Sequence, residues 1–202
     1  MKHLIAAALA AAAPALFAQQ ASKADLEAVQ RAVHVCASCH GPEGRSTIKL
    51  APSLAAQQRE YTIRQLKDFR NQKRAETDTQ AYMWGISALL TDDIIEGIAD
   101  YYAAQPPAKP KSTNPKLEAA GKKIFMEGIP GTPVRACASC HNEDAAGEAG
   151  FPRLAGLNAD YVFRQLRAFG TPLRPHGKIM KDETQALTPA QMKAVAAYVA
   201  SR

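Results

Sequence analysis

The spacing of apolar residues along the chain predicts short amphipathic helices separated by polar loops. In the first half, Leu26, Val29 and Val33 recur at the three-to-four-residue spacing of one helix face. Residues 59–70 repeat this pattern. Thr91 is suited to cap a further helix, because its hydroxyl precedes two acidic residues that favour the positive end of a helix dipole.

The second half of the chain repeats the first. Residues 161–169 have the same pattern as residues 61–69, and a final helix is expected to open at Thr188-Pro189, a capping hydroxyl followed by proline. Between the halves, residues 105–115 contain four prolines, which exclude a helix and predict an extended linker. We therefore expect a tandem repeat of one small helical unit.

One five-residue motif, Cys-Ala-Ser-Cys-His, occurs at residues 36–40 and again at residues 137–141. Cys-x-x-Cys-His is the attachment signature of c-type haem. Two thiols one helical turn apart reach the two vinyl groups of one porphyrin, and the histidine faces the iron. A redox dithiol, a zinc site and a disulfide framework are the alternatives. A dithiol needs no histidine, however, and a four-cysteine zinc site leaves both histidines unexplained.

Two methionines are the candidates for the second axial ligand of each iron. Met83 lies seven residues before Leu90, and Met180 lies seven residues before Leu187. An axial ligand has to occupy equivalent places in both repeats, and these two methionines do so. Thioether sulfur stabilises ferrous iron and raises its potential.

Two histidines are rivals for the same role. His34 lies only two residues before Cys36, which is too close to reach the opposite face of a porphyrin, and the position equivalent to His176 is Thr79, which cannot ligate. We therefore favour the methionines.

Two prolines follow the motif histidines at similar distances. Pro52 lies twelve residues after His40, and Pro152 lies eleven residues after His141. A carbonyl at either place could accept the Nδ1–H of the histidine and fix its ring. The alternative is that each proline only shapes its loop.

The N-terminus has the pattern of a secretory signal peptide. A polar start precedes an apolar run, and Leu16-Phe17-Ala18 offers a cleavage site. The run is short for a membrane span, although an uncleaved anchor stays open. Export agrees with haem attachment outside the bacterial inner membrane, so we expect a periplasmic protein. The predicted organisation is a signal peptide (1–18), an N-terminal domain (19–104), a Pro-rich linker (105–115) and a C-terminal domain (116–202).

With these motifs, the chain resembles the dihaem cytochrome c4 family. The resemblance covers nearly all of the chain after the signal peptide. It rests on both Cys-Ala-Ser-Cys-His motifs, on the duplicated Pro-x-Leu-Ala and Tyr-x-x-x-Gln-Leu-x-x-Phe segments, and on Met83 and Met180. It implies an all-α fold of two tandem class I cytochrome c domains, related by a pseudo-twofold axis, each with a few helices around one covalently bound haem.

Position by position, the resemblance implies two haem c groups with His/Met ligation. The implied residues are the thioether cysteines Cys36, Cys39, Cys137 and Cys140, the axial pairs His40/Met83 and His141/Met180, and the supporting Pro52 and Pro152. The first repeat departs from the second by lacking counterparts of Gly121 and Phe125 in its first helix and of Phe151 before its proline. We therefore expect different packing around the first haem.

The resemblance also implies a function. Family members carry electrons in the periplasm, either soluble or loosely attached to the membrane, which implies a cytochrome bc1 complex as donor and a cbb3-type terminal oxidase as acceptor. The net charge of +6 favours acidic partners or anionic membrane surfaces. No run of Lys or Arg and no nucleic-acid motif is present, so nucleic acid is not an expected partner.

We therefore expect an electron carrier and not an enzyme, because iron with both axial positions filled leaves no coordination site for a substrate. The main alternative keeps the fold and makes the chain the cytochrome c subunit of a periplasmic dehydrogenase complex. A dihaem peroxidase or thiosulfate oxidoreductase is the third hypothesis. It needs a labile, absent or cysteine sixth ligand, and the chain has no spare cysteine.

Overall fold

The computed structural model describes residues 12–75, 80–112 and 114–202. Within these residues every regular element is a helix, and the helices form two tandem units, which confirms the predicted all-α class. The first half contains α1 (Ala12–His40), the 3₁₀ turn η1 (Pro42–Gly44), α2 (Arg59–Arg70), α3 (Gln80–Ser87) and α4 (Asp92–Ala103). The second half contains α5 (Pro115–Glu127), α6 (Ala138–His141), α7 (Ala159–Ala168), α8 (Lys178–Thr184) and α9 (Pro189–Ala200).

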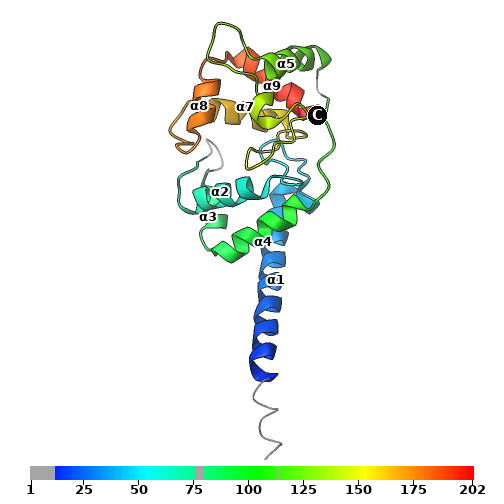
Figure 1. Cartoon of the computed structure of the whole chain (residues 1–202), viewed down its shortest axis with the longest axis vertical. Helices are drawn as coiled ribbons and strands as arrows, with labels where there is room; N and C mark the ends of the chain where they lie inside the picture. Colours follow the sequence, from blue (N-terminus) through cyan, green and yellow to red (C-terminus); the bar gives the residue numbers. More distant parts are fainter. Residues whose placement is uncertain (1–11, 76–79, 113) are drawn as a thin grey trace, which may run out of the picture.

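The two halves form two helical bodies, one above the other in Figure 1, and the N-terminal part of α1 extends away from both. Most of the predicted signal peptide lies in residues 1–11, outside the described residues, as does part of the polar connection at residues 76–79. Among the helices that the structure describes, none is both long and apolar enough to cross a bilayer.

Three helices begin where the sequence predicts. The bounds of α2 match the predicted helix over residues 59–70. Thr91 caps α4, with its side chain accepting a hydrogen bond from the backbone N–H of Ile94. Thr188 caps α9 through a capping box with Gln191, in which each side chain binds the backbone of the other residue.

The motif helix is built differently in the two domains. In the first domain α1 runs without a break through both cysteines to His40 and ends at Gly41, whose φ of 78° favours glycine. In the second domain α5 ends at Gly128, with φ of 71°, and the four-residue α6 carries the motif. The cause is local, since glycines and prolines interrupt residues 128–133 and no such residue lies between the start of the first helical pattern and Cys36.

Each domain has a close helix crossing that depends on one glycine. In the second domain, a Cβ on Gly121 of α5 would lie 2.0 Å from the carbonyl oxygen of Ala194 in α9. In the first domain, a Cβ on Gly97 of α4 would lie 2.5 Å from Cγ2 of Val29 in α1. The first helix of the first repeat lacks a counterpart of Gly121. In that domain the last helix, α4, supplies the glycine of the crossing instead, as Gly97.

We expect Gly121→Ala to lower the free energy of unfolding by about 1–3 kcal/mol, because the added methyl group meets backbone that cannot move aside alone. Urea unfolding of the haem-containing protein, followed by circular dichroism, measures this change. Gly85→Ala is the matched control, since a Cβ on Gly85 meets nothing within 4 Å. The control should leave stability unchanged or raise it by up to about 1 kcal/mol. Equal stability of the two variants would contradict the crossing as described.

Candidate haem sites

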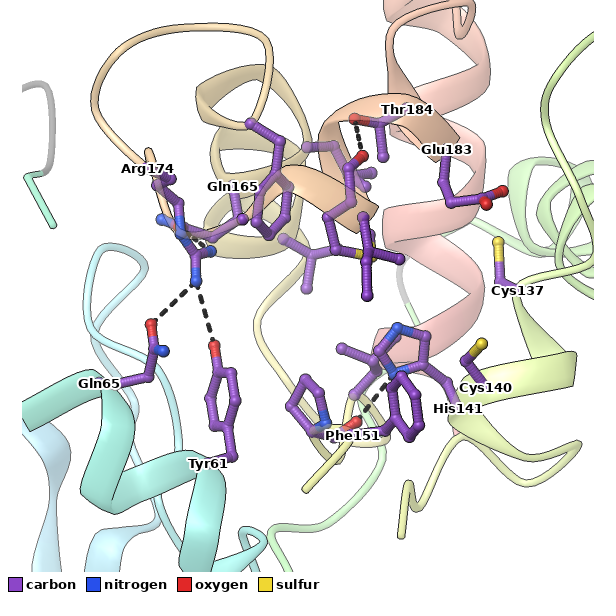
Figure 2. Close-up of a pocket in the computed structure, with 18 of the residues that line it drawn as sticks. Tyr61, Gln65, Cys137, Cys140, His141, Phe151, Gln165, Arg174, Glu183 and Thr184 are labelled. Carbon is purple, nitrogen blue, oxygen red and sulfur yellow. Dashed lines mark hydrogen bonds between the residues drawn. The ribbon is translucent and has the colours of Figure 1, made fainter. Parts of the chain in front are cut away.

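In the second domain the predicted haem residues line one cavity. Its volume is about 870 Å³, within the range of cofactor pockets. Its lining includes the five predicted site residues Cys137, Cys140, His141, Pro152 and Met180 of this domain, and a sixth, Pro52, from the first domain. Much of the remaining wall is apolar and comes from Phe125, Leu154, Leu157, Val162, Leu166, Leu187 and Val195. Figure 2 shows the two cysteines and His141 together at one end of this cavity.

A backbone carbonyl fixes the ring of the motif histidine. His141 is 4% exposed, and its Nδ1 lies 3.0 Å from the carbonyl oxygen of Pro152. Because the carbonyl can only accept, Nδ1 carries the proton and Nε2 keeps its lone pair. Burial lowers the pKa of His141, and the Pro152 carbonyl opposes that change without cancelling it. The imidazole is therefore neutral at neutral pH, which is the form that binds a metal.

The first domain has the same arrangement around its histidine. His40 is 8% exposed, and its Nδ1 lies 2.8 Å from the carbonyl oxygen of Pro52. Burial is the main cause of the lowered pKa of His40, with a further contribution from the positive charge of Arg74, while the Pro52 carbonyl opposes both. Cys36 and Met83 pack against one apolar cluster formed by Val29, Val33, Leu66, Ile95, Ile98 and Tyr102.

No disulfide engages the four thiols that would attach the haems. Burial raises the pKa of the Cys36 thiol and raises that of Cys137 to about 11, so both stay neutral at neutral pH. Among the described residues, no three His, Cys, Asp or Glu side chains are placed to hold one metal ion.

Both candidate methionines lie in short helices and not in loops. Met83 is in α3 and Met180 is in α8. The hydroxyl of Thr184 donates a hydrogen bond to the carbonyl oxygen of Met180 at 2.6 Å, which holds the last turn of α8. Because each methionine lies in a helix, its backbone position is fixed by the helix. The position of its sulfur atom then depends only on the rotamer of the methionine side chain.

The two histidines that were alternative candidates for the second axial ligand lie in environments different from those of the methionines. His34 is exposed on α1. His176 lines the rim of the second cavity, but its Nδ1 lies 2.8 Å from a carboxylate oxygen of Asp68 in the other domain.

Polar residues that the sequence did not predict close this cavity on the side of the first domain. Arg74 and Arg174 are 5% and 8% exposed, and both line the cavity. Gln65 and Gln165 line it as well. The available signal was their equivalence, because each pair is separated by one hundred residues in the repeat. Arginine and glutamine at such positions are also common on exposed helix faces, so the pattern alone did not place them inside.

The chain has two helical domains in tandem. Each contains a Cys-x-x-Cys-His helix and a buried histidine held by a proline carbonyl. This arrangement defines a c-type cytochrome with two haem sites. The free thiols, the neutral imidazoles and the apolar cavity all fit a covalently bound porphyrin.

Comparison with known proteins agrees with this class. The sequence matches the cytochrome c family over residues 12–104 and 118–202. It is 36% identical over 197 residues to cytochrome c4 of Thiocapsa roseopersicina, covering 94% of this chain and 95% of the relative. The solved cytochrome c4 of Acidithiobacillus ferrooxidans superposes with a TM-score of 0.77 at 35% identity, over 83% of this chain and 98% of that chain. A thiosulfate dehydrogenase electron acceptor of Thiomonas intermedia is 30% identical over 173 residues, covering 83% of this chain and 78% of the relative.

The chain belongs to the dihaem cytochrome c4 family. It carries two covalently bound haem c groups, one in each domain. The resemblance inferred from the motifs and the fold inferred from the repeat are both confirmed.

We expect Met180→Leu to leave both haems attached and to make one of the two irons high-spin in the ferric state, because leucine fills the space without offering a ligand. Electron paramagnetic resonance of the oxidised protein detects that change. Met192→Leu is the matched control, since Met192 is buried in the core of the same domain and lies in α9. A low-spin spectrum from Met180→Leu, like that of the control, would show that another group ligates the second iron.

Proposed function

We propose that this protein is a periplasmic dihaem cytochrome that carries single electrons between respiratory-chain proteins, with His40/Met83 and His141/Met180 as the axial pairs. The observation that carries this proposal is that Cys137, Cys140, His141 and Met180 line one cavity of the second domain. Similarity to cytochrome c4 proteins supports the electron-carrier role itself.

Haem c, when bound, supplies one-electron chemistry at its iron. The residues of the chain decide what else can happen there. The cysteines would hold the group covalently, the proline carbonyls orient the two imidazoles that would bind the iron, and Met83 and Met180 would supply the second ligands. With both ligands in place, no position would remain for a substrate to coordinate. The apolar walls exclude water, which keeps solvent rearrangement small when an electron arrives or leaves.

Sequence pattern, family resemblance and net charge support the proposed location and partners. The signal-peptide pattern of residues 1–18 and the chemistry of haem attachment favour the periplasm. Family resemblance favours a cytochrome bc1 complex as the donor and a cbb3-type oxidase as the acceptor. The net charge of +6 favours acidic docking surfaces on these partners, and also a loose association with an anionic membrane.

A second candidate function is the cytochrome subunit or dedicated electron acceptor of a periplasmic dehydrogenase. The observation that favours it is the similarity to the thiosulfate dehydrogenase electron acceptor of Thiomonas intermedia. A thiosulfate dehydrogenase of Marichromatium purpuratum also superposes with a TM-score of 0.73 at 31% identity, although this chain covers only 36% of it. In this role the protein accepts electrons from another enzyme and still performs no substrate chemistry of its own.

We expect the reduced protein to be reoxidised by a purified cbb3-type oxidase, with a rate that falls as ionic strength rises, because salt screens attraction between a basic carrier and an acidic partner. Oxygen uptake at several salt concentrations measures this rate. Reduction by a thiosulfate dehydrogenase in the presence of thiosulfate is the parallel assay for the second candidate. Rapid reduction there, together with no reaction with the oxidase, would reverse the order of the two proposals.

A further inference from the structure

The last helix of the first domain, α4, carries a buried tyrosine that the proposed electron transfer does not use. Tyr102 is completely buried, with 0% of its surface exposed. It belongs to the apolar cluster against which Cys36 packs. A phenol hydroxyl in such a place is costly unless it is hydrogen-bonded, because burial removes it from water. The surroundings of this hydroxyl therefore indicate what it does.

The two domains build the same backbone around this residue. In each domain, the loop that follows the motif makes three backbone hydrogen bonds in one pattern. Two of its N–H groups donate to the carbonyl oxygen of Gly44 in the first domain and of Ala145 in the second. A third N–H donates to the carbonyl oxygen of Tyr102 in the first domain and of Val199 in the second. Tyr102 and Val199 are therefore equivalent, as are Gly44 and Ala145.

The side chains at these equivalent positions differ in a complementary way. A Cβ on Gly44 would lie 2.7 Å from Cδ1 and 2.8 Å from Cε1 of Tyr102, so the glycine leaves the space that the ring fills. In the second domain Ala145 has a Cβ and Val199 is the smaller partner, and both are completely buried. Each pair fills its core, but the pair of the first domain also brings a hydroxyl group into it.

The hydroxyl of Tyr102 makes no hydrogen bond of normal geometry to the residues that the structure describes. The thiol of Cys36 is nonetheless close enough to interact with it. Burial raises the pKa of the Cys36 thiol, and the hydroxyl of Tyr102 opposes that rise by acting as a donor to the thiolate. Burial also raises the pKa of Tyr102, with smaller contributions from Cys36 and Tyr101, so the phenol keeps its proton at neutral pH.

Haem attachment changes the group that this hydroxyl faces. Cys36 becomes a thioether when the first haem is bound, and a thioether sulfur has no proton and acts only as a weak acceptor. The phenol keeps its proton and is a donor. Its O–H is free to turn about the C–O bond toward an acceptor. A bond from Tyr102 to this sulfur would therefore satisfy a buried hydroxyl that otherwise has no partner among the described residues.

We propose that the hydroxyl of Tyr102 donates a hydrogen bond to the thioether sulfur of Cys36 and thereby raises the reduction potential of the first haem. This inference rests on the dihaem carrier proposed above. The positive end of the O–H dipole then points toward the porphyrin edge in a poorly solvated core. It opposes the extra positive charge of ferric haem, and so favours the reduced state. Val199 has no polar side-chain atom, so the second haem lacks this contribution.

The direct test is redox titration of the haem-containing Tyr102→Phe variant, followed optically. The two one-electron steps are assigned by the proton NMR signals of the axial methionine methyl groups. Phenylalanine keeps the ring that packs on Gly44 and removes only the hydroxyl. We expect the equilibrium constant for reduction of the first haem to fall about threefold, equivalent to about 28 mV at 59 mV per tenfold change for one electron. The constant of the second haem should change by less than 1.5-fold.

Tyr82→Phe is the matched control, because Tyr82 lies in α3 of the same domain and is 71% exposed. It loses the same hydroxyl from a place in contact with solvent, and should change either constant by less than 1.5-fold. Urea unfolding of the haem-containing proteins gives a second measurement. Removal of a hydrogen-bonded hydroxyl does not stabilise a fold, whereas removal of a buried hydroxyl without a partner does. We therefore expect the unfolding midpoint of Tyr102→Phe to be no higher than that of the unmodified protein.

A fall of less than twofold at the first haem, an equal fall at both haems, or a raised unfolding midpoint in Tyr102→Phe would overturn the inference. These outcomes are distinct from a failure of the proposed function. A native chain without two His/Met haems contradicts the proposed function, whereas an unchanged potential in a Tyr102→Phe variant that keeps both haems contradicts only the role of Tyr102.

Discussion

Two buried hydrogen bonds, from the motif histidines to proline carbonyls, are the contacts on which each site depends. His40 and His141 are almost completely buried, and their Nδ1 atoms lie 2.8 Å and 3.0 Å from the carbonyl oxygens of Pro52 and Pro152. Each bond joins the end of the motif helix to the loop that follows it and leaves Nε2 as the only ring nitrogen with a free lone pair. The helices and apolar walls around each histidine serve to hold this one orientation.

Duplication of this unit lets one domain close the cavity of the other. Residues of the first domain, including Tyr61, Gln65 and Arg74, line one side of the second-domain cavity. Arg74 and Arg174 each bind polar residues of both domains. The copies are not identical inside, because the crossing glycine is Gly97 on the last helix of the first domain and Gly121 on the first helix of the second. Equivalent chemistry is therefore supported by different packing.

The sequence predicted the fold class well, because its signals were local and occurred twice. Capping by Thr91 and Thr188 and the bounds of α2 follow from short-range patterns, and the structure confirms them. The continuous α1 was harder to predict, since its difference from α5 and α6 lies in the lack of breaking residues over a long segment. The contacts of Arg74 and Arg174 across the domain interface were not predicted, because they join residues about one hundred positions apart and no local pattern records such pairing.

The central claim is that both irons have a histidine and a methionine ligand and leave no site open for a substrate. Quantitative near-infrared spectroscopy of the oxidised protein tests it most directly, because a methionine sulfur bound to ferric haem gives a weak charge-transfer band. We expect two equivalents of this band per chain. One equivalent, or a high-spin ferric signal in the unmodified protein, would contradict it and would indicate a haem at which substrate chemistry can occur.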